Sequence, residues 1–200
     1  MKHIVITIGR EYGSGGRLVA KKLSEELGIT FYDKELISAV AKKTGFSENF
    51  IRDTEHQRPT NSFLFDLYTV VQTPSVPDQV FIAQSRVIKE AAAKESCVIV
   101  GRCADYILRE REDCLHTFIH ASVPFRADRI VRLYGESEKS PEKRLADKDT
   151  RRRVNYKHYT DREWGMAQNY HITLDSGVLG IDRCVEIILD LAQRDYPENK

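Results

Sequence analysis

The sequence predicts an α/β fold in which helices cover both faces of a parallel β-sheet, giving three layers. Short apolar segments rich in β-branched residues alternate along the chain with longer segments whose apolar residues recur every three or four positions. The short segments are apolar on both faces, as strands buried on both sides are. This alternation is typical of a doubly wound parallel sheet. Five segments are expected as strands: 4–8, 28–33, 97–101, 115–121 and 170–174.

The first strand, turn and helix are expected within residues 4–27, IVITIGREYGSGGRLVAKKLSEEL. The turn contains the glycine run Gly13, Ser14, Gly15 and Gly16. Glycines at a strand-to-helix junction allow left-handed backbone and let N–H groups converge on an anion at the helix N-terminus. This stretch therefore predicts a site for the phosphates of a nucleotide, the alternative being a tight turn without a ligand.

The glycine run departs from the P-loop pattern G-x-x-x-x-G-K-[ST]. When Gly13 to Gly15 are aligned with the end of that pattern, Arg10 falls at its first glycine, Gly16 at its lysine, and Arg17 after it. The phosphate-binding lysine and the magnesium-binding hydroxyl are therefore missing from their usual places. Arg10 and Arg17 can supply the positive charge, because a guanidinium binds phosphate as a planar fork. Ser14 is the only hydroxyl in the run.

Composition suits one α/β domain and points to no macromolecular partner. The 200 residues are 41% hydrophobic and 30% charged, which is typical of a soluble domain with a sizeable core. The net charge of +1 gives no argument for nucleic acid or membrane, and no apolar run has the length of a membrane span. The four cysteines show neither a C-x-x-C pair nor zinc-site spacing, and no secretory leader is evident, so we expect a cytoplasmic protein with reduced thiols.

Charged residues follow the second and third predicted strands. Asp33 and Lys34 come after the second strand, and Arg102 comes directly after the third. Because ligands of open parallel sheets bind at the carboxyl ends of the strands, these residues are candidates for substrate, phosphate or magnesium contacts. Asp33 can equally cap the following helix, and Asp105 can either orient Arg102 or cap the helix after it.

The region 44–95 is predicted to be a helical insertion, with short helices near Phe50 and around 63–71 and a long helix from Val80 to Ala91. Scattered polar residues on these helices are more typical of solvated surface than of a substrate site. They are Arg52, Arg58, Gln79, Gln84 and Arg86.

Positive charge is concentrated between residues 126 and 162, which hold twelve Lys and Arg against seven Asp and Glu. Such a cluster is a solvated helix face, an RNA-binding patch or, in a phosphotransferase, a lid that closes over the donor and offsets charge on the transferred group. Asp149, Arg152 and Arg153 are the best spaced candidates for the lid function.

Several segments together resemble the cytidylate kinase-like family, relatives of the nucleoside monophosphate kinases. They are ITIGREYGSGGRLVAKKLSEELGITFYDKELI, CVIVGRCADYIL, FIHASVPFRADRI, DKDTRRRVNYKHYTDREWG and NYHITLDSG. The resemblance implies one P-loop kinase-like domain over residues 1–200, with a five-stranded core of about 1–43, 96–135 and 165–200. It also implies a nucleoside-monophosphate-binding insertion at about 44–95 and an arginine-rich lid at about 136–164.

Site residues follow from the same resemblance. It implies that the donor phosphates lie around Gly13, Ser14, Gly15, Gly16 and Arg17, that Asp33 and Arg102 bind the acceptor, and that Asp149, Arg152 and Arg153 belong to the catalytic lid segment. Their positions and charge add Arg10 to the expected donor site, Lys34 and Asp105 to the expected acceptor site, and Arg17 to the residues expected to serve catalysis. Ser14 and Asp33 are candidate Mg²⁺ ligands. The implied activity is ATP-dependent phosphoryl transfer to a nucleoside monophosphate, with CMP or dCMP favoured. A nucleotide-binding regulatory protein with weak or lost catalysis and a kinase of another small metabolite are the alternatives, and the sequence does not fix the oligomeric state.

Overall fold

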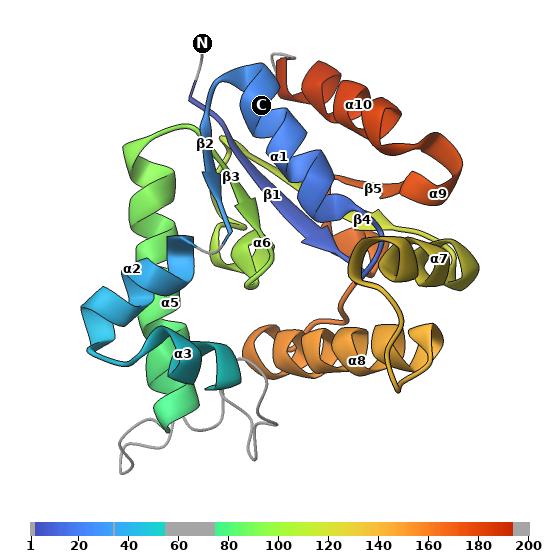
Figure 1. Ribbon diagram of the computed structural model, residues 1–200. Coiled ribbons are helices and arrows are strands. Elements are labelled where there is room, and N and C mark those ends of the chain that lie inside the picture. Colours follow the sequence, from blue (N-terminus) through green and yellow to red (C-terminus); the bar gives the residue numbers. More distant parts are fainter. Residues whose placement is uncertain (1–2, 34, 55–74, 194–200) are drawn as a thin grey trace.

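The sheet is parallel and five-stranded, as the sequence predicts, in the order β2-β3-β1-β4-β5. The computed structural model describes residues 3–33, 35–54 and 75–193. The strands are β1 (Val5–Arg10), β2 (Thr30–Tyr32), β3 (Cys97–Val100), β4 (Cys114–His120) and β5 (Ile172–Asp175). Because all five run in the same direction, their carboxyl ends share one edge, at the lower right of the sheet in Figure 1.

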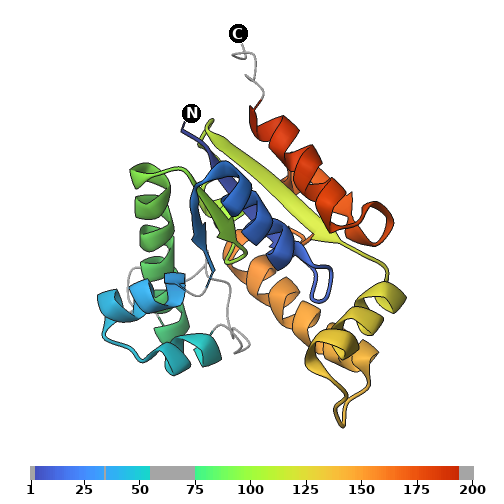
Figure 2. The same cartoon turned by 45° about the horizontal axis from the view of Figure 1, so that its top comes forward.

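Helices cover both faces of the sheet, which confirms the three-layer architecture (Figures 1 and 2). The helices are α1 (Gly16–Leu27), α2 (Glu35–Thr44), α3 (Glu48–Thr54), α5 (Val76–Lys94), α6 (Ala104–Ile107), α7 (Val123–Tyr134), α8 (Pro141–Thr160), α9 (Ser176–Leu179) and α10 (Ile181–Gln193). A 3₁₀ turn spans Ala167–Asn169. No helix within the described ranges is long and apolar enough to cross a membrane.

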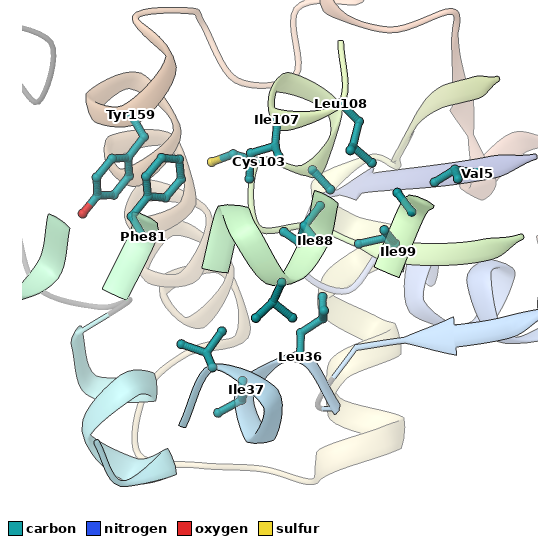
Figure 3. Close-up of a cluster of buried hydrophobic side chains, with 14 of the residues drawn as sticks. Val5, Leu36, Ile37, Phe81, Ile88, Ile99, Cys103, Ile107, Leu108 and Tyr159 are labelled. Carbon is teal, nitrogen blue, oxygen red and sulfur yellow. The ribbon is translucent and has the colours of Figure 1, made fainter. Parts of the chain in front are cut away.

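Two hydrophobic clusters hold the layers together, one on each face of the sheet. On one face, Ile6 and Ile8 of β1 pack with residues of α1 and α10, which lie side by side in both views. On the other face, Ile99 of β3 packs with Leu36 of α2 and Ile88 of α5 (Figure 3). Strand side chains alternate between the two clusters, so each strand needs the apolar residues on both faces that the sequence shows.

The central strand extends two residues further than the apolar pattern predicts. Gly9 and Arg10 continue the register of β1 against Phe118 and Ile119 of β4. Gly9 has no room for a side chain, because an added Cβ would lie 2.7 Å from Cδ2 of Phe118. Because Arg10 is the last residue of β1, it lies at the carboxyl edge of the sheet.

The first helix ends at Leu27 as predicted, whereas the long helix of the insertion extends beyond the predicted Val80 to Ala91 at both ends. Gly28 ends α1 in a left-handed conformation at φ 62°, and α5 begins at Val76 because Ser75 caps it by accepting the N–H of Asp78. Pro124 lies in the first turn of α7, where its missing N–H costs nothing. The helix predicted around residues 63–71 lies outside the described residues.

Candidate active site

A cleft of about 300 Å³ opens at the carboxyl edge of the sheet between α5 and α8. It collects side chains from the loop after β1, from the ends of β2 and β3 and from the two helices. Among the described residues, the charged ones that line it are five cations and one acid: Arg10, Arg102, Lys148, Arg151, Arg152 and Asp33. Figure 1 shows α8 crossing below the carboxyl ends of the strands. The cleft thus has the charge and the position expected of a site for phosphate-bearing ligands.

The glycine run forms the turn between β1 and α1. Gly13 and Gly15 have left-handed backbone at φ 82° and 83°, a region in which residues with a Cβ are strained. The Ser14 hydroxyl is turned into the loop, where it donates to the carbonyl oxygen of Glu11 (2.9 Å) and accepts the N–H of Gly16 (3.4 Å). The N-cap residue Gly15 has no side chain to cap α1, and the positive end of the helix dipole faces the glycine run, where it favours an anion.

Asp149 anchors this loop to α7 and α8 and does not line the cleft. Its Oδ1 accepts the N–H of Tyr12 (2.8 Å), and its Oδ2 accepts Nη1 of Arg126 (2.5 Å). The same Nη1 donates to the carbonyl oxygen of Tyr12 (3.1 Å), and both charged side chains are less than one-tenth exposed. The pair fixes the loop with charge-assisted hydrogen bonds, so the structure gives Asp149 a positioning role.

The two predicted lid arginines face different hollows. Arg152 lines the cleft, and its Nη1 donates to the carbonyl oxygen of Arg10 (3.1 Å) and to Asp149 (3.3 Å). Arg153 lines a second hollow of about 440 Å³ with Glu11, Trp164 and other residues. Successive side chains of an α-helix point about 100° apart, because a turn holds 3.6 residues. The structure therefore does not bring Arg152 and Arg153 together.

Asp33 brings together two arginines that the sequence places far apart. Nε of Arg17 donates to Oδ2 of Asp33 (2.6 Å), and Nη1 of Arg102 lies 3.9 Å from Oδ1. The Arg17 side chain is 61% exposed and the Arg102 side chain 12%, so the second lies deeper in the site. Lys34 lies outside the described residues.

The backbone at the end of β3 is strained around Arg102. Gly101, Arg102 and Cys103 are consecutive left-handed residues at φ 70°, 56° and 53°. Such conformations are unfavourable for residues with a Cβ and occur often at ligand sites. Gln84 of α5 supports this turn by donating from Nε2 to the carbonyl oxygen of Arg102 (3.3 Å). Gln84 is 5% exposed, although the sequence favoured a surface position.

Aromatic and aliphatic side chains line the part of the cleft between α5 and α8. Phe81 of α5 stacks on Tyr159 of α8 with 3.8 Å between ring centroids and 8° between planes (Figure 3). Pro77 and Val80 extend this surface along α5. The cleft therefore has a cationic part at the sheet edge and an apolar part against α5, which suits a ligand with a phosphate and a flat base.

Four lining residues on α8 were not predicted: Lys148, Arg151, Asn155 and Tyr159. Their spacing of three or four residues places them on one face of the helix, the face that also carries Arg152. That spacing was visible in the sequence. Burial, and next the neighbouring charges of Arg151 and Arg152, lower the pKa of Lys148, so an anion in the cleft would relieve this repulsion.

Asp105 does not line the cleft but ties α6 to α8. Its carboxylate accepts the hydroxyl of Tyr156 (2.6 Å), and both side chains are buried. Burial raises the pKa of Asp105 to about 6. The folded state therefore binds the Asp105 proton more tightly than the unfolded chain does. The stability that this proton contributes is complete below about pH 4 and is lost as the pH rises through 6.

The Asp105→Asn variant should remove this pH dependence, since an amide oxygen can still accept the Tyr156 hydroxyl. The free energy of unfolding of the variant minus that of wild type is expected to increase by about 2–3 kcal/mol from pH 4 to pH 7, because wild type alone loses stability over this range. This amount is the equivalent of a shift of about two pKa units. Urea unfolding at both pH values measures this difference. Parallel stability profiles for the two proteins would contradict it.

The model of the cytidylate kinase-like family matches residues 5–178, and the chain belongs to that family. Family and fold together support a kinase-type phosphotransferase. A cytidylate kinase of Aeropyrum pernix is 22% identical over 183 residues, which cover 91% of this chain and 95% of the relative.

Solved structures share the fold along almost the whole chain. An uncharacterised protein of Eubacterium ventriosum is 30% identical, with a TM-score of 0.75 over 96% of this chain and 100% of its own. A gluconokinase of Sinorhizobium meliloti (14% identity, TM-score 0.56) covers 95% of this chain and 94% of its own. A shikimate kinase of Acinetobacter baumannii (16%, 0.54) covers 95% of this chain and 93% of its own. The last two likenesses establish the P-loop kinase fold.

Proposed function

We propose that this protein transfers a phosphoryl group from ATP, with Mg²⁺, to the phosphate of a nucleoside monophosphate, with CMP or dCMP the favoured acceptor. The observation that carries the proposal is the charge of the cleft, where five cations and one carboxylate line the space between the glycine run, α5 and α8. The family supports the choice of a cytidine nucleotide.

The balance of charge favours a phosphorylated acceptor over a neutral sugar. A nucleoside monophosphate brings close to two negative charges, which Arg102 and Arg152 can bind with charge-assisted hydrogen bonds. Its base is flat and largely apolar on its faces, and the surface formed by Val80 and Phe81 suits it. We therefore assign Arg102 and Arg152 to the acceptor phosphate and the part of the cleft against α5 to the base.

The residues present fit the donor phosphates and one Mg²⁺ ion. The N-terminus of α1 and its two left-handed glycines provide the cradle that a phosphate requires. No cluster of three or more potential metal ligands occurs in the described part of the chain. Mg²⁺ is commonly held by phosphate oxygens, waters and one or two carboxylates, and Asp33, whose Oδ2 accepts Nε of Arg17, can supply one of them through Oδ1. Ser14 is less suited, because its hydroxyl is already bonded within the loop.

Phosphoryl transfer asks little covalent chemistry of the chain, because the attacking oxygen belongs to the acceptor phosphate. The side chains need to align the two phosphates, exclude water and offset the charge that spreads over the transferred group. We assign this task to Arg10, Arg102 and Arg152 in the cleft, with Arg17 at its margin. Asp149 holds the loop in place, and Arg153 lines the second hollow, outside the acceptor site, so we assign it no part in the transfer.

A nucleotide-binding regulatory protein is the second candidate, and the absent lysine favours it. Loss of that residue in a P-loop weakens both donor binding and catalysis. Such a protein would bind ATP and a nucleoside monophosphate without acceptor-dependent formation of ADP. Turnover with an acceptor other than a nucleoside monophosphate would instead indicate a kinase of another small metabolite.

Replacing Arg102 tests the acceptor site by binding alone. Arg102→Ala should weaken the binding of CMP by about 1.5–3 kcal/mol, the contribution of a hydrogen bond to a charged group. Isothermal titration calorimetry measures this loss. Arg109→Ala is a matched control, because Arg109 is partly exposed and pairs with Glu110. Equal CMP affinity in wild type and Arg102→Ala would overturn the assignment.

A further inference from the structure

Gly16 is the residue that falls where the P-loop pattern has its lysine, and the structure shows why it is a glycine. It is not among the residues with positive φ, so its backbone does not require glycine. An added Cβ would lie 2.6 Å from Cβ and 3.2 Å from Cγ of Arg10, and 3.2 Å from Cβ of Ile119. The space in which a lysine side chain would begin is therefore filled by the stem of Arg10.

The Arg10 side chain continues from Gly16 across the edge of the sheet to the end of β3. A Cβ built on Gly101 would lie 1.8 Å from Nη1 of Arg10 and 3.0 Å from its Cζ. The guanidinium thus lies over the backbone of Gly101, next to Arg102 in the chain, and Arg10 lines the cleft. One side chain therefore connects the start of α1 with the cationic part of the site.

Arg17 is the other candidate for the missing charge, and its geometry suits the task less well. Its side chain is 61% exposed and its Nε donates to Asp33. It does not line the cleft. An exposed arginine outside the cleft is more strongly screened by solvent than one that lines it, so it offers less to a phosphate.

We propose that Arg10 takes the place of the absent P-loop lysine, reaching the donor phosphates from the end of β1 while Gly16 leaves room for its stem. This inference rests on the proposed function for the identity of the donor, ATP. An arginine at residue 10 and a lysine at residue 16 are alternatives for one space. The planar guanidinium binds phosphate oxygens in pairs where the ammonium group would act as a point charge.

The first test separates the charge of Arg10 from its packing. Arg10→Met keeps an unbranched stem beside Gly16 and removes the guanidinium. Calorimetry should show that ATP and inorganic tripolyphosphate each bind roughly 10- to 100-fold more weakly, the loss expected for one charge-assisted contact. The melting temperature of the ligand-free protein should stay close to that of wild type. Arg183→Met, in an exposed pair with Glu186 on α10, controls for loss of an arginine elsewhere. Wild-type affinity for both ligands in Arg10→Met would overturn the proposal.

The second test moves the cation back to the usual position. Gly16→Lys alone should lower the melting temperature of the ligand-free protein by roughly 5 °C, because the new stem collides with that of Arg10. The double variant Arg10→Gly with Gly16→Lys should recover most of that loss and should bind tripolyphosphate more tightly than Arg10→Gly does. If Gly16→Lys destabilises the wild-type protein and the Arg10→Gly variant equally, residues 10 and 16 do not compete for one space, and the proposal is contradicted.

These readouts distinguish the inference from the function on which it rests. Arg10-dependent binding of ATP and tripolyphosphate without transfer to any nucleoside monophosphate would support the role of Arg10 and reject the proposed acceptor. Transfer to CMP by Arg10→Met at the wild-type rate would support the function and reject the role of Arg10.

Discussion

Asp149→Ala is expected to destabilise the protein by about 3 kcal/mol, the lower end of the cost of removing one partner of a buried ion pair. The variant would leave the buried Arg126 guanidinium with Glu11, 3.3 Å from its Nε, as its carboxylate partner and would also remove the acceptor of the Tyr12 N–H. Because these bonds hold the loop before α1, the binding of ATP should weaken as well. Urea unfolding measures the first effect, and calorimetry with ATP measures the second.

Asp147→Ala is the matched control, two residues away on α8. Asp147 pairs with Lys139 at the surface, where solvent screens the pair, so its loss should leave the free energy of unfolding close to that of wild type. The double variant Arg126→Met with Asp149→Leu should recover part of the stability, because the buried Arg126 guanidinium is removed together with its carboxylate partner. A loss below about 1 kcal/mol in Asp149→Ala would show that the pair does not hold the loop.

Arg152→Ala should lower kcat by about 100- to 1,000-fold, the effect of removing one preorganised donor from a developing charge. The side chain lines the cleft, and Nη1 is held by the carbonyl oxygen of Arg10 and by Asp149. Burial lowers the pKa of Arg152, yet a guanidinium stays charged at neutral pH. Steady-state ADP release with CMP as acceptor measures the change.

Arg153→Ala distinguishes a specific role of Arg152 from a general loss of positive charge on the lid. Arg153 is the next residue on α8, but it lines the second hollow. Its replacement should therefore keep kcat within about fivefold of wild type, the equivalent of an exposed charge. Equal losses in the two variants would contradict the assignment of Arg152 alone to the cleft.

The fold could be predicted from the sequence because each of its elements has a local signal. The apolar runs predicted all five strands, and the end of the first helix at Leu27 was predicted from its apolar stripe. The end of β1 was missed by two residues, because Gly9 and Arg10 are not apolar. Their place in the strand comes from pairing with β4, which the local sequence does not contain.

The site was only partly predictable, since side-chain direction and burial depend on distant parts of the chain. Asp33 and Arg102 were found because both follow strands, and the ends of parallel strands meet at one edge. Asp149 and Asp105 looked like site residues, but they bond with Tyr12, Arg126 and Tyr156 instead of lining the cleft. Gln84 had a signal that was overlooked, because it continues the apolar stripe through Val80 and Val87.

The most direct test of the proposed function is ADP release from Mg-ATP by the wild-type protein with CMP, dCMP, UMP, AMP or GMP as acceptor. We predict ADP formation that depends on the acceptor, is fastest with CMP or dCMP, and falls to near background in Arg152→Ala. Absence of acceptor-dependent ADP from wild-type protein that binds both ATP and CMP would contradict the assignment of a nucleoside monophosphate kinase and favour a nucleotide-binding regulatory protein.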